Sequence, residues 1–113
     1  MNVMRSAPSD LPSEVSVYDV SARDGLQNES AQVSTHAKVR LVEALFDAGI
    51  MRLEVGSFVS PKWVPHMADA DEVCRMIERR PGVTYACLCP NERGLDREIA
   101  SKVYEVAFFV SAS

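Results

Sequence analysis

The sequence lacks any apolar run long enough to cross a bilayer, and it contains only three cysteines. A spanning helix needs about 20 predominantly apolar residues, so we expect a protein that does not enter the membrane. An odd number of cysteines does not make a disulfide framework, which favours a reducing compartment. Residues 1–14 lack the apolar core of a secretion signal and the arginine-rich pattern of a transit peptide. We interpret this stretch as a flexible leader of a cytoplasmic protein.

The sequence also lacks a cluster of basic residues interleaved with aromatic ones. Its net charge is -4 and its pI is near 5.1, whereas a nucleic-acid-binding surface needs an excess of positive charge. We therefore expect no nucleic-acid partner. The 113 residues, 47% of them hydrophobic, suffice for the core of one small domain.

Apolar periodicity predicts four short strands alternating with three helices. The strands are expected at 15–20, 51–55, 83–89 and 104–110, and the helices at 35–49, 68–80 and 92–102. Strands joined by helical crossovers of this length are parallel, so the order βαβαβαβ predicts an α/β fold with a parallel sheet. Two architectures fit this order, an open doubly wound sheet and the first half of a barrel that closes at eight strands.

The first predicted helix carries clear signals at both ends. Ser34 or Thr35 can cap its N-terminus, and Gly49 suits a left-handed residue at its C-terminal end.

Polar residues are concentrated in the segments that follow the first two predicted strands, 21–34 and 56–69. In parallel α/β folds the C-terminal ends of the strands form the functional face, so these side chains are expected to gather there. A dinucleotide-binding sheet would show a glycine fingerprint after its first strand, whereas "ARDGLQ" has one glycine.

Arg23 and Asp24 are the first candidates for chemistry. A guanidinium stabilises an oxyanion and a carboxylate suits a hard divalent cation, although a local ion pair that shapes a turn is equally consistent with their spacing. Glu54 lies within a predicted strand, where a carboxylate needs a partner. That partner is a cation of the site, Arg52 or Arg23.

Other reactive residue types have structural interpretations. Cys87 and Cys89 face the same way in a strand and are expected to pack in the core, as is Cys74 on a helix. A lone His66 is weak evidence for a metal site, and we expect a surface or loop histidine. Trp63 is expected to anchor a long loop.

Three stretches, "VSVYDVSARDGLQNE", "EVGSFVSPKWVPHMADADEV" and "CPNERG", resemble the N-terminal part of the hydroxymethylglutaryl-CoA lyase family of aldol and Claisen metallolyases. The resemblance implies that 15–113 form the N-terminal half of a (β/α)8 TIM barrel. It also implies cleavage of 3-hydroxy-3-methylglutaryl-CoA to acetyl-CoA and acetoacetate with Mg²⁺ or Mn²⁺, in leucine catabolism and ketone-body metabolism.

The same resemblance assigns roles to five residues. Asp24 corresponds to the metal-binding aspartate, and Arg23 to the arginine that stabilises the enolate of the departing thioester. Glu54 corresponds to a catalytic acid that holds this arginine, while Gln27 and Ser57 correspond to substrate-binding residues. An acyl-CoA substrate and a homo-oligomeric complete enzyme are implied as well.

The resemblance leaves alternatives within and outside the family. A relative could act on another 3-hydroxy-3-alkylglutaryl-CoA, or be a condensing synthase that uses a 2-oxo acid, and a catalytically dead assembly piece would keep the same loops. The remaining metal ligands of the family lie beyond Ser113, so we expect an inactive, truncated chain. We also expect Val17, Leu53 and Leu88 to point into the barrel without a covering wall, and the sheet edge to promote self-association.

Overall fold

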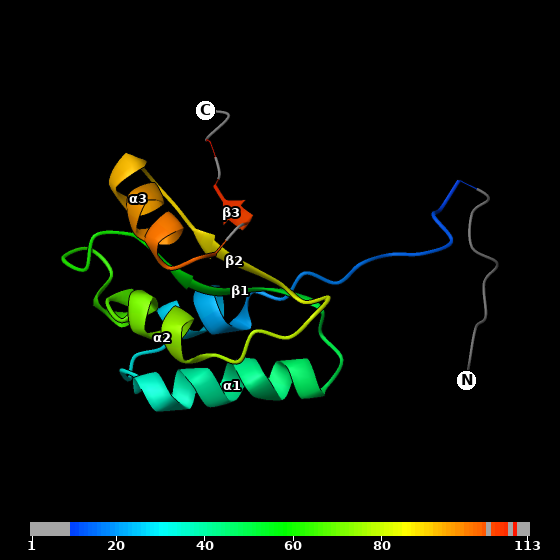
Figure 1. Cartoon of the computed structure of the whole chain (residues 1–113), viewed down its shortest axis with the longest axis horizontal. Coiled ribbons are helices and arrows are strands. Elements are labelled where there is room, and N and C mark those ends of the chain that lie inside the picture. The colour runs from blue at the N-terminus through cyan, green and yellow to red at the C-terminus, as the bar shows by residue number, and fades with distance from the viewer. Residues whose placement is uncertain (1–9, 104, 109, 111–113) are drawn as a thin grey trace.

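The computed structural model describes residues 10–103, 105–108 and 110, and it shows a mixed α/β unit around a three-stranded parallel sheet (Figure 1). The strands lie in the order β1-β2-β3, so strands that are neighbours in the sheet also follow one another in sequence. The elements are η1 (Ser21–Gly25), α1 (Thr35–Asp47), β1 (Arg52–Ser57), η2 (Pro65–Met67), α2 (Ala70–Met76), β2 (Thr84–Leu88), α3 (Glu92–Ala100) and β3 (Glu105–Ala107). The predicted parallel α/β fold is confirmed.

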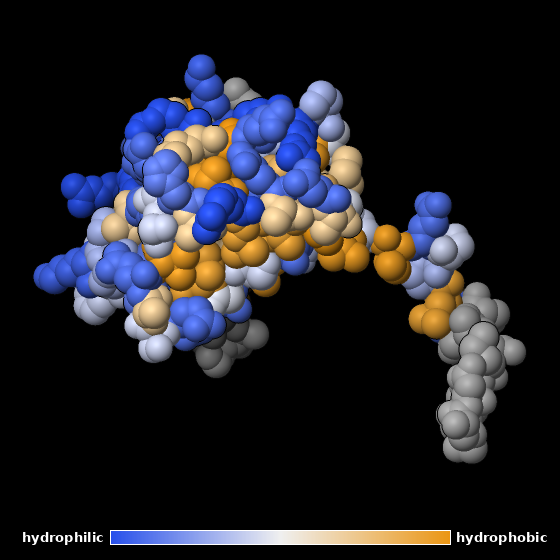
Figure 2. Space-filling model, turned by 90° about the horizontal axis from the view of Figure 1, so that it is seen from below, coloured by the Kyte–Doolittle hydropathy of each residue, from blue (hydrophilic) through white to orange (hydrophobic). Residues whose placement is uncertain are grey.

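The first predicted strand is wrong for most of its length. Only Asp19 pairs with the sheet, through a single parallel bridge to Leu53, and the side chains of Val15 and Val17 are exposed. This segment has β1 on one side only, and among the described residues no layer covers its apolar side chains. Figure 2 shows apolar side chains along this extended segment, outside the body of the molecule.

The last predicted strand is shorter than expected. It spans Glu105–Ala107, and both Phe108 and Val110 are exposed. Tyr104 and Phe109, which the prediction also included, lie outside the described residues.

α1 and α3 begin where the sequence predicts, α2 begins two residues later, at Ala70, and all three helices end earlier than predicted. Ser34 caps α1, because its Oγ accepts a hydrogen bond from the backbone N–H of Ala37 at 3.2 Å, and Gly49 adopts a φ of 98° just after the helix. In α2 the chain becomes extended at Ile77, whose side chain is buried in the core. Arg79 then donates a hydrogen bond to the carbonyl of Cys74, which satisfies the helix end.

One face of the sheet is covered by helices, and we call it the helix-covered face. α2 packs on β1 and α1 packs on α2 (Figure 1). Leu53 faces this layer with no exposed surface, so the expectation that it points into the barrel is wrong. All three cysteines are buried as predicted, with the sulfur atoms of Cys74 and Cys87 3.7 Å apart.

The apolar core under the helices consists of the following buried residues: Ala22, Val39, Val42, Phe46, Leu53, Val55, Phe58, Ala70, Val73, Cys74, Ile77, Tyr85, Cys87 and Val103. No helix in the described part of the chain is long and apolar enough to cross a membrane.

The opposite face carries charged residues, and we call it the polar face. Arg52 and Glu54 lie on it because side chains alternate along β1, and Glu105 joins them from β3 through the register of the three strands. Arg52 donates to Oε1 of Glu105 from Nε at 3.1 Å and from Nη2 at 2.7 Å. The two faces of one sheet therefore differ in chemistry.

Candidate functional site

The motif that begins the site is a π-helix rather than a loop. In η1 the carbonyl of Val20 accepts backbone hydrogen bonds from Arg23, Asp24 and Gly25, at 3.2, 2.7 and 3.3 Å. Such wide turns are rare and occur often at functional sites. The turn is fixed at its start, because Oδ1 of Asp19 accepts hydrogen bonds from the backbone N–H and the hydroxyl of Ser21.

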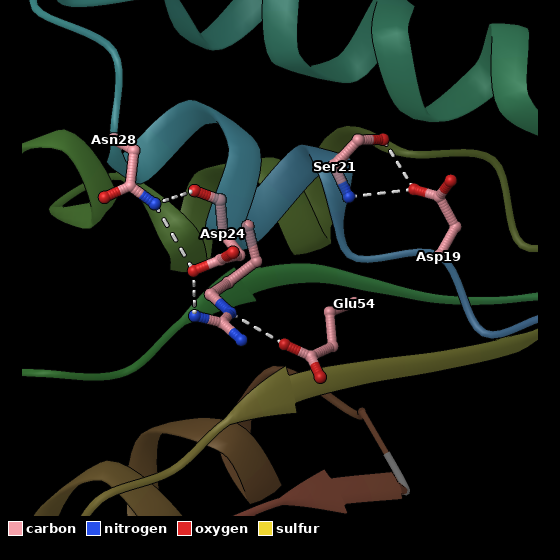
Figure 3. A network of polar contacts seen from close by, with 6 residues as sticks. Asp19, Ser21, Asp24, Asn28 and Glu54 are labelled. Atoms are coloured by element: carbon pink, nitrogen blue, oxygen red, sulfur yellow. Dashed lines mark hydrogen bonds and ion pairs between the residues drawn. The ribbon is translucent and has the colours of Figure 1, made fainter.

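Arg23 and Glu54 form the central ion pair of the site (Figure 3). Nε of Arg23 donates to Oε1 of Glu54 at 2.7 Å, and the side chains are 15% and 6% exposed. Of the partners that the sequence left open for Glu54, the structure thus selects Arg23, since Arg52 pairs with Glu105. The ion pair fixes the direction in which the guanidinium presents its remaining N–H groups.

Asp24 points away from the core and its side chain is 53% exposed. Its Oδ1 lies 3.2 Å from Nη1 of Arg23 and accepts a longer hydrogen bond, 3.4 Å, from Nδ2 of Asn28. Nδ2 of Asn28 also donates to the carbonyl of Asp24 at 2.8 Å. The sequence interpretation gave Asn28 no role, although the spacing of four residues between a carboxylate and an amide was a usable signal.

A metal ion would find only part of a site here. Among residues 10–103, 105–108 and 110, no group of three histidine, cysteine or acidic side chains is placed to hold a metal. Divalent ions such as Mg²⁺ take about six oxygen ligands, several of them water. The exposed carboxylate of Asp24 could fill one of these positions, so the described residues are compatible with a cation but do not form a complete site.

Ser57 reaches the polar face because β1 contains an irregularity. Glu54 is paired with Ala86 and Ser57 with Leu88, and the register shifts in between, so one extra residue of β1 is inserted there. Strict alternation would place Glu54 and Ser57 on opposite faces, whereas the bulge places them on the same one. Gly56, within the bulge, lets α2 pack closely on β1, because a Cβ atom there would lie 3.2 Å from Cβ of Ala70.

Two polar atoms close to this cluster lack a partner. The Oγ of Ser57 and the Oε1 of Gln27 are buried and have no hydrogen-bond partner among the described residues. Buried polar atoms are nearly always satisfied in folded proteins, so these two atoms are available to a polar ligand. Gln27 also lines an apolar groove of about 790 Å³ together with Val59, Leu88 and Leu95.

Tyr18 belongs to the same face and was missed by the sequence interpretation. Burial raises the pKa of its hydroxyl above the usual range, and a hydrogen bond with Glu54 and the negative charge of that residue raise it further. The guanidinium carbon of Arg52 lies 5.1 Å from the centre of the Tyr18 ring. The aromatic residue thus lies near one member of each ion pair, Arg52 and Glu54, and remains a neutral hydrogen-bond donor.

The loop after Ser57 differs in part from its prediction. Trp63 is 80% exposed, so the expectation that it anchors this loop is wrong for the described residues. His66 lies in the short helix η2 as a loop histidine, consistent with its prediction, and its carbonyl accepts a hydrogen bond from Lys38.

Comparison with known families gives a match over almost the whole chain. Residues 14–113 match the family described as HMGL-like. A Pseudomonas aeruginosa protein named 3-hydroxy-3-isohexenylglutaryl-CoA/hydroxy-methylglutaryl-CoA lyase is 52% identical over 103 residues, which cover 91% of this chain and 34% of the relative. The human mitochondrial hydroxymethylglutaryl-CoA lyase is 44% identical over 111 residues, covering 98% of this chain and 34% of the relative.

Solved structures agree with these relatives. The hydroxymethylglutaryl-CoA lyase of Pseudomonas aeruginosa superposes with a TM-score of 0.88 over 91% of this chain and 34% of that one. An HMG-CoA lyase of Acinetobacter baumannii, in complex with coenzyme A and 3-methylmalate, is 40% identical and superposes with a TM-score of 0.85, covering 96% and 35% of the two chains. The chain thus spans about a third of the length of the relatives it matches.

Proposed function

This chain belongs to the HMGL-like family, and we propose that it forms the N-terminal part of a metal-dependent carbon-carbon lyase that cleaves 3-hydroxy-3-methylglutaryl-CoA to acetyl-CoA and acetoacetate. Its parallel sheet and helices correspond to about a third of a TIM-barrel lyase. The remaining two thirds of the relatives' length have no counterpart in the 113 residues, so the activity is proposed for the complete barrel.

The observation that carries the proposal is the oriented guanidinium of Arg23. Glu54 holds it from one side at 2.7 Å, and the exposed carboxylate of Asp24 stands next to it. When the carbon-carbon bond breaks, negative charge develops on the thioester oxygen of the acetyl-CoA fragment. A charge fixed in advance stabilises such an oxyanion more than one that must reorient, and Arg23 is fixed in this way.

The other residues bind and orient the substrate. The unpaired Ser57 hydroxyl is suited to donate a hydrogen bond to the substrate carboxylate, and Gln27 Oε1 is suited to accept one from the substrate hydroxyl. We propose Asp24 as one ligand of Mg²⁺ or Mn²⁺, which supplies Lewis-acid polarisation of the substrate when bound. Glu54 acts on the reaction through Arg23.

An acyl-CoA ligand is supported by a structural neighbour, whose complex contains coenzyme A and 3-methylmalate. We propose that the complete enzyme is a cytoplasmic homo-oligomer, as the sequence interpretation predicts.

A bulkier substrate is the second candidate. The Pseudomonas aeruginosa relative is named for a 3-isohexenyl as well as a 3-methyl substrate, and it is 52% identical to this chain. The groove beside Gln27 is mostly apolar, which suits a longer alkyl substituent.

A chimera tests the proposal. Residues 14–113 replace the matching segment of the Pseudomonas aeruginosa lyase, and cleavage of both acyl-CoA substrates is measured. We expect lyase activity, and Arg23→Gln should lower kcat about a hundredfold or more while changing KM less, because the arginine acts where charge develops.

Arg75→Gln is the matched control, because Arg75 is an exposed cation on α2 whose side chain is 69% accessible. We expect its kcat to stay at the chimera's value. A kcat for Arg23→Gln within a few-fold of the chimera would remove Arg23 from this role.

A further inference from the structure

Lys38 is a buried cation in a place where local rules disfavour it. It lies in the first turn of α1, where the positive end of the helix dipole opposes a positive side chain, and it is only 4% exposed. Its Nζ donates to Oδ1 of Asp69 at 2.5 Å and to the carbonyl of His66. The hydrogen bonds of this ammonium therefore connect α1 to the segment that precedes α2.

Asp69 also lacks the side-chain hydrogen bond that would cap its own helix. It occupies the N-cap position of α2, where aspartate normally accepts a hydrogen bond from its own helix, yet it makes no such bond. Both carboxylate oxygens are turned to α1 instead, Oδ1 toward Lys38 and Oδ2 toward the hydroxyl of Thr35 at 2.5 Å. Lys38 and Asp69 thus each adopt a locally unfavourable arrangement in order to contact one another. Such an exception to local rules is typical of a functional or strained site.

The contact joins the two segments that carry the proposed site. α1 follows the segment of Arg23 and Asp24, and residues 58–69 follow Ser57. The latter segment begins at the sheet, where the backbone N–H of Phe58 donates to the carbonyl of Leu88 at 2.8 Å. Val59, the next residue, lines the same groove as Gln27.

A gain in stability is a weak explanation for this pair. Removing a lysine and a carboxylate from water costs about as much as their attraction returns, so an apolar pair of the same size would stabilise the fold as well. A directional pair with three hydrogen bonds instead fixes a geometry. We infer that Lys38 is a positioning residue, which through Asp69 and the carbonyl of His66 holds the segment 58–69 in place beside the substrate groove; this role rests on the proposed function.

Two residues of the segment 58–69 can report on its mobility. Lys62 is an exposed trypsin site, and Trp63 is the only tryptophan of the chain and is 80% exposed. We compare the 113-residue chain with its Lys38→Met variant, measuring the rate of tryptic cleavage after Lys62 and the fluorescence anisotropy of Trp63. We expect cleavage at Lys62 to become about tenfold faster and the anisotropy to fall, because the far end of the segment is released.

Arg40→Met is the matched control, since Arg40 is an exposed cation two residues further along α1. It should leave both signals unchanged. Asp69→Asn, which removes the charge but keeps the size of the side chain, should give a smaller acceleration in the same direction, and it serves as the test if Lys38→Met does not fold.

Two results would overturn the inference. One is unchanged cleavage at Lys62 in both folded variants. The other is an equal acceleration at Lys62 and at Arg52 in β1, because general loss of stability would expose both sites alike.

The chimera separates this inference from the proposed function. There, Lys38→Met should raise KM for the acyl-CoA about tenfold and lower kcat less, because it misplaces the segment that lines the groove without removing a reacting group. An inactive chimera in which the local cleavage effect persists would contradict the lyase proposal and leave the positioning role standing. An active chimera whose KM and kcat are unchanged by Lys38→Met would contradict the positioning role.

Discussion

The two faces of the same sheet are held together by different interactions. On the helix-covered face, β1 presents Leu53 and Val55 to a continuous apolar core. On the polar face, the same strand presents Arg52 to Glu105 and Glu54 to Arg23. Apolar burial is the main source of stability, whereas ion pairs near the surface contribute little to it but are strongly directional. One face of the sheet therefore stabilises the unit, and the other orients a guanidinium.

Truncation of the helix-covered face should have the largest effect on stability. Leu53→Ala removes a side chain with no exposed surface and leaves a cavity in the core. We expect the free energy of unfolding to fall by about 2–5 kcal/mol, measured by urea denaturation followed by circular dichroism.

Val17→Ala provides the control, because Val17 precedes the single bridge of Asp19 and is 61% exposed. We expect a change below about 0.5 kcal/mol. A loss similar to that of Leu53→Ala would show that 15–20 form a packed strand after all.

Breaking the polar face should cost less. Glu54→Ala leaves the partly buried guanidinium of Arg23 without its closest partner. We expect a loss of about 2–3 kcal/mol in the same denaturation experiment, since an unpaired charge keeps its desolvation penalty. Asp24→Ala removes the exposed partner of the same arginine and should cost under about 1 kcal/mol. Equal losses for the two variants would contradict the difference in burial.

Glu98 is an exception on the helix-covered side, and its effect should be smaller than that of Glu54→Ala. It lies in α3 with no exposed surface, and both of its carboxylate oxygens lack a hydrogen-bond partner among the described residues. Burial raises its pKa from about 4.5 to about 7, because the charged form loses its hydration. The folded state therefore holds the proton to higher pH than the unfolded state does.

The raised pKa of Glu98 lowers the free energy of unfolding as the pH rises. The contribution of Glu98 to stability is fully present below pH 4.5 and is lost as the pH rises toward and through 7. Each pKa unit corresponds to about 1.4 kcal/mol, and local relaxation and water penetration around the buried carboxylate reduce this, so we expect a loss of about 1–2 kcal/mol. Glu98→Gln should remove this loss and be more stable than the parent at pH 8 but not at pH 4. Parallel pH profiles of the two proteins would exclude Glu98 as the source.

The alternation of strands and helices was readable from the sequence because it depends on local patterns. Apolar periodicity located α1, β1 and β2, and the capping residue Ser34 and the left-handed Gly49 were recognised from residue type alone. The motif of Arg23 and Asp24 was likewise visible as a polar cluster after an apolar run, whereas the family was identified from the resemblance of three longer stretches. Such signals act over a few residues, so no knowledge of the packing was needed.

The partners of the charged side chains and the register of the strands depend on tertiary contacts. Glu54 could have paired with Arg52 or Arg23, and the choice was made by contacts 31 residues apart in sequence. The bulge that turns Ser57 to the polar face arises from pairing with β2, where one-residue shifts leave no trace in periodicity. The contact of Lys38 with Asp69 and the loss of pairing before Asp19 also depend on neighbours that are distant in sequence or absent. Residue types determine which interactions are available, and packing selects among them, because each charged group or strand edge has more possible partners than it can use.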